Sequence, residues 1–171
     1  MDLAQLLARH GRGEEAVAVM RAQADAPGGA EDWVVHMLCT LYTDQGRPQD
    51  GLAYLDALKA RRGKEEWELF WIRLPLMAAC DQVDEAVEQT RTHPEGDTRY
   101  AVSHVARLLA DAGRLKEAVA ALEPHSPANS RDLAGYLIDL GRVEQAIAVL
   151  QQHRPKPSAP SPGPWHDTPP F

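Results

Sequence analysis

The sequence lacks the features typical of membrane-spanning, secreted and disulfide-rich proteins. No apolar run approaches the roughly 18 residues that a membrane-spanning helix needs. The opening residues, MDLAQLLARHGRG, have neither the basic flank nor the uninterrupted apolar core of an export signal. Only two cysteines occur, Cys39 and Cys80, and each falls in an apolar helical stretch, where a thiol behaves as a small hydrophobe. We expect a soluble, cytoplasmic protein whose two thiols are reduced and buried, with no membrane partner.

Basic residues are also scarce. The 171 residues contain 18 Lys and Arg against 25 Asp and Glu, a formal net charge of -7. Such a surface repels the phosphates of nucleic acid over most of its area. We therefore expect no nucleic-acid partner, although a small basic patch is compatible with this balance.

Sequence motifs that would indicate catalysis or metal binding are absent as well. The G-R-G at Gly11 has no preceding strand and no following Lys-Ser/Thr, both of which a phosphate loop needs. The glutamate pairs at 14–15 and 65–66 fall in first helical turns, where carboxylates offset the helix dipole. His36 and Cys39 are three residues apart, but neither C-x-x-C nor H-E-x-x-H completes a zinc site. We expect no enzymatic activity, no cofactor and no metal.

One short phrase is present in five copies. Each copy ends one apolar helical stretch and opens another: GRGEEAVAVM from Gly11, GRPQDGLAYL from Gly46, DQVDEAVEQT from Asp81, GRLKEAVAAL from Gly113 and GRVEQAIAVL from Gly141. A small residue marks the second helix of each copy: Ala16, Gly51, Ala86, Ala118 and Ala146. These markers are 35, 35, 32 and 28 residues apart, close to the roughly 34-residue period of helix-turn-helix solenoids.

Apolar residues also recur at fixed distances before these markers, and each set of equivalent positions is called a column here. Twelve residues before the markers are Ala4, Cys39, Leu74, Ala106 and Ala134, and nine before them are Leu7, Tyr42, Met77, Leu109 and Leu137. Positions three apart share a helix face, so each repeat has an apolar stripe facing its second helix. The predicted helices cover residues 2–10, 14–25, 31–45, 48–62, 64–80, 83–92, 98–112, 114–123, 129–140 and 142–153. No useful stretch alternates with period two, so we expect an all-α protein.

At these positions the chain resembles the tetratricopeptide-repeat family. Trp33, Tyr42 and Gly46 match the first-helix and turn positions of the family, and four of the five markers supply its small second-helix residue. Asp81 and Gly51 depart from the pattern. The Ala/Arg/Gly-rich GR-x-x-E-A phrasing is similar to repeats common in high-GC bacteria. The resemblance implies a right-handed α-solenoid of about five tetratricopeptide-like repeats over residues 1–153.

The resemblance also implies a binding surface, because such solenoids usually bind an extended peptide or a helix on the concave face formed by their first helices. The matching positions are Trp33, His36, Thr40, Asp44, Glu68, Trp71, Tyr100, Ser103, Arg107 and Arg131. Here the three aromatic residues would form a line and the two arginines a basic end for a carboxylate. Alternatively, the tryptophans fill gaps between repeats. The Lys and Asn pattern of the family's chaperone-carboxylate clamp is absent.

The positions of the prolines lead to two further predictions. Pro75 lies inside the helix predicted over residues 64–80 and should kink or break it near Leu74. After the repeats, residues 154–171 contain seven prolines and should form an extended or disordered tail. Trp165 and Phe171 make this tail either a docking segment with two anchors or a solvated extension with two incidental aromatics.

Three functions are compatible with this pattern. The first is a protein-protein interaction scaffold that binds its partner in the groove. The second is a self-assembly module that forms a homo-oligomer through the tail or through the N-terminal edge, where no earlier hairpin covers Leu3, Leu6 and Leu7. The third is a regulatory domain detached from a DNA-binding or enzymatic partner.

Overall fold

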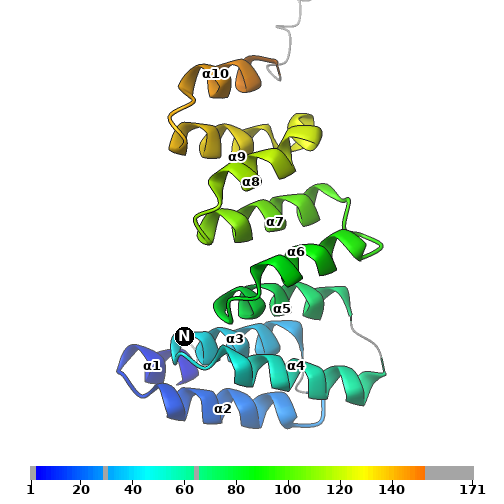
Figure 1. Cartoon of the computed structure of the whole chain (residues 1–171). Coiled ribbons are helices and arrows are strands. Elements are labelled where there is room, and N and C mark those ends of the chain that lie inside the picture. Colours follow the sequence, from blue (N-terminus) through cyan, green and yellow to red (C-terminus); the bar gives the residue numbers. More distant parts are fainter. Residues whose placement is uncertain (1–2, 29–30, 64–65, 153–171) are drawn as a thin grey trace, which may run out of the picture.

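The computed structural model describes residues 3–28, 31–63 and 66–152, and every regular element in these ranges is helical. The elements are α1 (Leu3–Arg9), α2 (Gly13–Asp25), α3 (Asp32–Asp44), α4 (Pro48–Arg62), α5 (Trp67–Ala79), α6 (Val83–Thr92), α7 (Arg99–Asp111), α8 (Leu115–Leu122), the 3-10 helix η1 (Glu123–His125), α9 (Ser126–Asp139) and α10 (Val143–Gln152). They pair as five successive hairpins that stack from α1 and α2 at one end to α10 at the other (Figure 1). The predicted all-α solenoid of helical repeats is confirmed.

The turn inside each hairpin has one repeated geometry. Gly11, Gly46, Gly113 and Gly141 have φ between 68° and 75°, in the left-handed region that glycine enters without strain. The residue after each glycine donates a backbone hydrogen bond five residues back, as when the Arg114 N–H donates to the Leu109 carbonyl at 2.8 Å. This bond defines a Schellman helix end. The repeated phrase in the sequence is therefore a repeated helix stop.

The core follows the predicted columns. All five marker positions are buried, and Ala118 and Ala146 are 0% and 1% exposed. The columns twelve and nine residues before the markers are also buried, except that Leu7 is half-buried. Thr90 lies four residues after its marker, where the other repeats have Met20, Leu55, Leu122 and Leu150, and its buried hydroxyl donates to the Ala86 carbonyl at 2.8 Å. The predicted repeat register is thus confirmed.

Two local predictions are wrong. The helix does not break near Leu74, since α5 continues through Pro75; the neighbouring Leu74 and Leu76 are almost wholly buried, and their packing offsets the lost backbone hydrogen bond. The segment PHSP at Pro124 falls between the predicted helices 114–123 and 129–140 and was expected to be a connection, but it is helical: η1 leads directly into α9. Proline fits the first turn of a helix, where its missing N–H has no helical partner.

The two cysteines differ from each other. Cys39 is buried, as predicted, and burial raises the pKa of its thiol to about 12. Cys80 is only half-buried, because it is the C-terminal cap of α5 and therefore lies at the edge of the hairpin. Neither forms a disulfide in the part of the chain that the structure describes. The helices in that part are also too short or too polar to cross a membrane.

Candidate peptide-binding groove

Two neighbouring cavities lie between the first helices of the fourth and fifth hairpins. One, of about 410 Å³, is lined by residues at the start of α7 and by residues 128–132 of α9. The other, of about 260 Å³, continues toward Arg107 and Tyr136. Tyr100, Ser103 and Asp132 line both cavities. The two therefore form one continuous depression, here called the α7–α9 groove.

Helix α7 presents its polar face to this groove because its apolar face is fixed in the core. Ala101, Val102 and Val105 are buried on that apolar face. The helix begins at a capped end, where the Thr98 side chain accepts a hydrogen bond from the Ala101 N–H at 3.3 Å. Such a cap satisfies one of the unpaired donors of the first turn. The direction in which Tyr100 and Ser103 project is thus set by sequence periodicity and by the cap.

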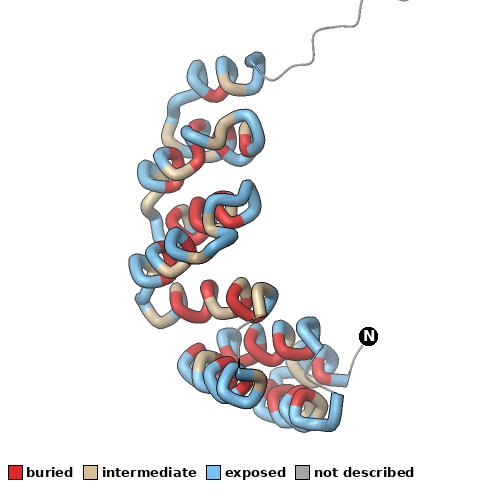
Figure 2. Tube along the Cα trace, turned by 90° about the vertical axis from the view of Figure 1, so that its right-hand side faces the viewer, coloured by how far each residue is buried: buried red, intermediate tan, exposed pale blue. Residues whose placement is uncertain are grey.

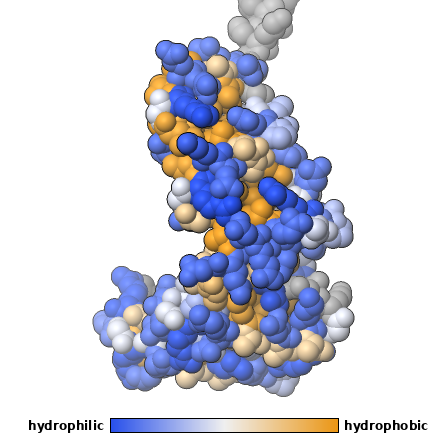
Figure 3. All heavy atoms as spheres, viewed as in Figure 1, coloured by the Kyte–Doolittle hydropathy of each residue, from blue (hydrophilic) through white to orange (hydrophobic). Residues whose placement is uncertain are grey.

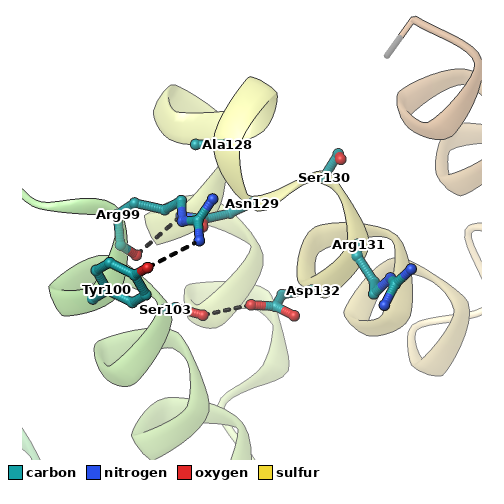
Figure 4. Close-up of a pocket in the computed structure, with 8 residues that line it drawn as sticks. All are labelled: Arg99, Tyr100, Ser103, Ala128, Asn129, Ser130, Arg131 and Asp132. Carbon is teal, nitrogen blue, oxygen red and sulfur yellow. Dashed lines mark hydrogen bonds between the residues drawn. The ribbon is translucent and has the colours of Figure 1, made fainter. Parts of the chain in front are cut away.

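Asn129 shapes the other wall of the groove. Its backbone is not helical, with φ -118° and ψ 23°, so α9 is kinked one turn after it begins. The Asn129 side chain is buried and its amide donates to the Arg99 carbonyl at 3.4 Å, which ties the kink to the start of α7 (Figure 4). Because the kink redirects the helix, residues 128–132 curve around the end of the groove rather than lying straight against α7.

An exposed aromatic ring and three guanidinium groups dominate the groove. The Tyr100 side chain is 68% exposed, and the Arg99 guanidinium carbon lies 4.9 Å from its ring centroid. Arg107 and Arg131 add two more positive charges, against one lining carboxylate, Asp132. That carboxylate accepts a hydrogen bond from the Ser103 hydroxyl. The residues that line the groove therefore carry three positive charges and one negative charge, on a protein whose net charge is -7.

His104 extends the groove toward α5. Its ring is stacked on Trp71 with centroids 4.5 Å apart, and its Nδ1 lies 3.0 Å from Arg107 Nη2. Burial, and secondarily the charge of Arg107, lower the pKa of His104 below its usual value. The imidazole is therefore neutral at pH 7, and its Nδ1 accepts a hydrogen bond from Arg107. This bond holds the guanidinium of Arg107 beside the groove.

The predicted site residues within the described ranges fall into three groups. Tyr100, Ser103, Arg107 and Arg131 all line the α7–α9 groove. Trp71 is half-buried in an aromatic cluster, where its ring packs edge-on against Trp67 at 4.4 Å, so it serves the packing between repeats as well as the surface. The remaining residues are exposed on α3 and α5 and line neither cavity of the groove: Trp33, His36, Thr40, Asp44 and Glu68. The tail residues Trp165 and Phe171 lie outside the described residues.

Sequence reasoning missed the seven other residues that line the groove: Arg99, His104, Ala128, Asn129, Ser130, Asp132 and Tyr136. A signal for two of them was available. The column fourteen residues before the markers reads Met37, Ile72, His104 and Asp132 in the second to fifth repeats. It changes from apolar to polar at the two helices that form the groove. A polar residue in an otherwise apolar column indicates that the first helices have parted there.

Metal binding has no support in the described ranges, which contain no cluster of three or more His, Cys, Asp or Glu side chains placed to hold an ion.

Comparisons with known proteins give only a structural likeness. No protein-family model and no curated protein matches the chain. Among solved structures, the chain is similar to MamA of AMB-1 (20% identity, 88% of this chain and 85% of that chain covered, TM-score 0.45). It is equally similar to MamA of MSR-1 (20% identity, 88% and 90% covered, TM-score 0.45), and a mutant of MamA gives a TM-score of 0.44. At this level of similarity we draw nothing about function from MamA.

Proposed function

We propose that the protein is a non-enzymatic interaction scaffold that binds an extended segment of another protein in the α7–α9 groove. The observation that supports this most is the exposed Tyr100 ring, flanked by Arg99, in a depression shared by two first helices. Aromatic rings and arginines are the side chains that most often dominate the free energy of protein-protein binding. The segment that fits has a carboxylate next to an apolar side chain.

The chemistry of the groove specifies this ligand. A carboxylate forms charge-assisted hydrogen bonds with guanidinium groups, and Arg99, Arg107 and Arg131 lie around the groove. An apolar side chain gains contact area on the face of Tyr100 while the phenol edge stays hydrated. The two connected cavities run along α7, which suits an extended chain better than a compact small molecule.

Isothermal titration with short peptides tests the proposal. The panel consists of acetylated hexapeptides with Asp or Glu beside Leu or Phe, each matched with a peptide that has Lys in place of the acid. We expect the acidic peptides alone to bind, and Tyr100→Ala to weaken binding about tenfold or more. Trp33→Ala is the matched control, since it removes an exposed aromatic from another first helix outside the groove. Equal binding of acidic and Lys peptides, or no effect of Tyr100→Ala, would contradict the proposal.

The proposal also covers the domain boundaries and the cellular location of the protein. We place residues 1–153 in one repeat domain and residues 154–171 in a proline-rich tail, in a protein that acts in the cytoplasm, where thiols stay reduced.

A second candidate function is self-association, and one observation favours it. On α1, Leu3 and Leu6 are 57% and 40% exposed. In the second repeat the same positions are Leu38 and Leu41, and both are buried against the neighbouring hairpin. The N-terminal end of the solenoid is therefore an apolar surface of the kind that pairs with another chain.

A further inference from the structure

Helix α10 has an uncovered apolar face. Val143, Ile147 and Leu150 are 50%, 48% and 48% exposed and lie on one side of the helix, at spacings of four and three residues. The same three positions in the preceding repeat, Leu115, Val119 and Leu122, are half-buried or buried. Apolar residues gather at this end of the molecule in Figure 3, and Figure 2 shows α10 as mostly exposed. Helix α10 thus has the apolar face of an internal repeat, and no helix among the described residues covers it.

The exposed apolar face of α1 is the counterpart of the exposed face of α10. In the internal repeats, the column that begins with Leu3 continues as Leu38, Arg73, Val105 and Leu133, and the column that begins with Leu6 continues as Leu41, Leu76, Leu108 and Tyr136. These internal residues are buried or half-buried, and α3, α7 and α9 each follow the second helix of the preceding hairpin. Within the described residues, therefore, no second helix precedes the exposed face of α1 and no first helix follows the exposed face of α10.

The same ion pair between neighbouring repeats occurs at two junctions, and it defines how one repeat is aligned on the next. Arg47, at the turn of the second hairpin, binds Asp50 of its own repeat and Glu14 of the preceding one, at 2.9 Å from Glu14. Arg114 repeats this arrangement with Glu117 of its own repeat and with Asp84 of the preceding one, at 2.6 Å from Asp84. The acid of the preceding repeat is in both cases two residues before its marker. The arginine is four residues before its own marker.

Both halves of a third such pair are present at opposite ends of the chain. Arg12 occupies the arginine position and binds Glu15 of its own repeat at 2.5 Å, but no described residue takes the place of Glu14 or Asp84. Glu144 occupies the acid position in α10 and is exposed, with no ion pair among the described residues. The internal junctions do not all have this pair: Lys116 precedes Arg142, where the charges are alike.

We infer that α10 of one copy of this chain docks against α1 of a second copy, with Glu144 of the first copy paired to Arg12 of the second, which reproduces an internal repeat junction head to tail. The two surfaces lie at opposite ends of the stack, so one copy cannot satisfy both (Figure 1). The inference deepens the second candidate function, self-association, and is independent of peptide binding in the α7–α9 groove. A head-to-tail contact of this kind leaves a free end on each copy and extends into an open chain or closes into a ring.

The length of α1 determines how much of α10 it covers. Helix α1 has 7 residues, whereas α3, α5 and α7 have 13. By register, α1 corresponds to the second half of a first helix, next to the turn. Because successive helices run antiparallel, this half packs on the beginning of the preceding second helix. Val143 and Ile147 should therefore be covered by α1, and they flank Glu144.

The test uses two full-length variants, each blocked at one end, and light scattering coupled to size exclusion. Leu6→Glu removes the α1 face and keeps the α10 face, and Ile147→Glu does the reverse. We expect the wild type to form species larger than a monomer, each variant alone to be monomeric, and their mixture to form a one-to-one dimer. Ile138→Glu is the control, because Ile138 is 52% exposed on α9 but lies outside the junction columns. It should assemble as the wild type does.

Charge reversal tests the register. Arg12→Glu and Glu144→Arg should each weaken association about fivefold, as expected for an exposed ion pair, and a mixture of the two variants should recover most of it. Assembly that is lost with Leu6→Glu but kept with Ile147→Glu would overturn the inference in favour of an α1–α1 contact. A wild type that is monomeric until residues 154–171 are deleted would overturn it in favour of the tail covering α10. A wild type that is monomeric in every form would overturn self-association altogether, while the peptide titration would stand.

Discussion

Asp81 occupies the position that glycine occupies in the other four hairpin turns. Its φ is 60°, close to the 68° of Gly46 and the 75° of Gly113, so the backbone geometry is kept although the residue is changed. The hydrogen bond from the Gln82 N–H to the Met77 carbonyl is also kept, at 2.9 Å. A residue with a Cβ is strained in this conformation, and Asp is among the side chains that tolerate it best. The third repeat therefore keeps its turn at a local cost in stability.

This strain predicts that Asp81→Gly stabilises the protein. We expect an increase of about 0.5–1 kcal/mol in the free energy of unfolding, because glycine enters the left-handed region without strain. Gly113→Ala is the opposite change at the equivalent turn and should lower stability by about 1 kcal/mol. Urea unfolding followed by circular dichroism measures both. A decrease in stability for Asp81→Gly would mean that its carboxylate contributes more than the backbone strain removes.

The helices pack closely where the repeated small residues meet neighbouring side chains. At Gly51 the helices are too close for any side chain: a Cβ built on it would lie 2.8 Å from Leu76 Cδ2 of α5. This close contact explains why the second repeat has glycine where the other repeats have alanine. Ala118 has the equivalent place in α8 and is fully buried. Interiors packed to this density accommodate added methyl groups only by displacing neighbours.

Ala118→Leu should therefore destabilise the fourth hairpin by about 1–3 kcal/mol through overpacking. Ala120→Leu is the matched control: it is the same substitution in α8 at an exposed position and should change stability by less than about 0.5 kcal/mol. Thermal and urea unfolding of both variants provide the comparison. Equal stabilities would show that the register of α8 differs from the one described.

At the scale of the whole molecule, the apolar core is a series of clusters along the stack. One extends from Ala4 to Leu76, a second joins α5, α6 and α7, and a third extends from Val87 to Ala146. Each hairpin contacts mainly its neighbours, so stability is the sum of repeat and junction contributions. The two terminal helices have the smallest share, since Ala4 is the only buried residue of α1 and Ala146 the only one of α10.

Hydrogen exchange should reveal this gradient. In the Leu6→Glu variant, which has no intact α1 face to cover α10, we expect the amides of α10 to exchange at least about tenfold faster than those of α7, because α10 opens before the central repeats. Mass spectrometry of exchanged, protease-digested protein gives the rates. Matching protection in α7 and α10 of a monomeric sample would indicate a cooperative unit that includes the last hairpin.

Periodicity in the sequence was sufficient to predict the helices, the turns and the buried columns. A repeated helix stop and a repeated small residue specify hairpins, because each is a local requirement of the backbone or of one close contact. The same register placed Tyr100, Ser103, Arg107 and Arg131 on the faces that line the groove. It did not predict that Trp33 and Glu68 would lie outside the cavities, because equal register does not imply an equal opening between helices.

Tertiary structure decided where the surface is hollow and which apolar residues are covered. The kink at Asn129 depends on its partly buried hydrogen bond to the Arg99 carbonyl of α7, thirty residues away, and no local pattern specifies such a contact. The continuity of α5 through Pro75 likewise depends on the packing around Leu74 and Leu76. Ile147 and Val119 occupy one column in the sequence, yet only the position of α10 at the end of the stack leaves Ile147 exposed. Local patterns determine which face of a helix is apolar, but the neighbours that cover the face are determined only by the assembled solenoid.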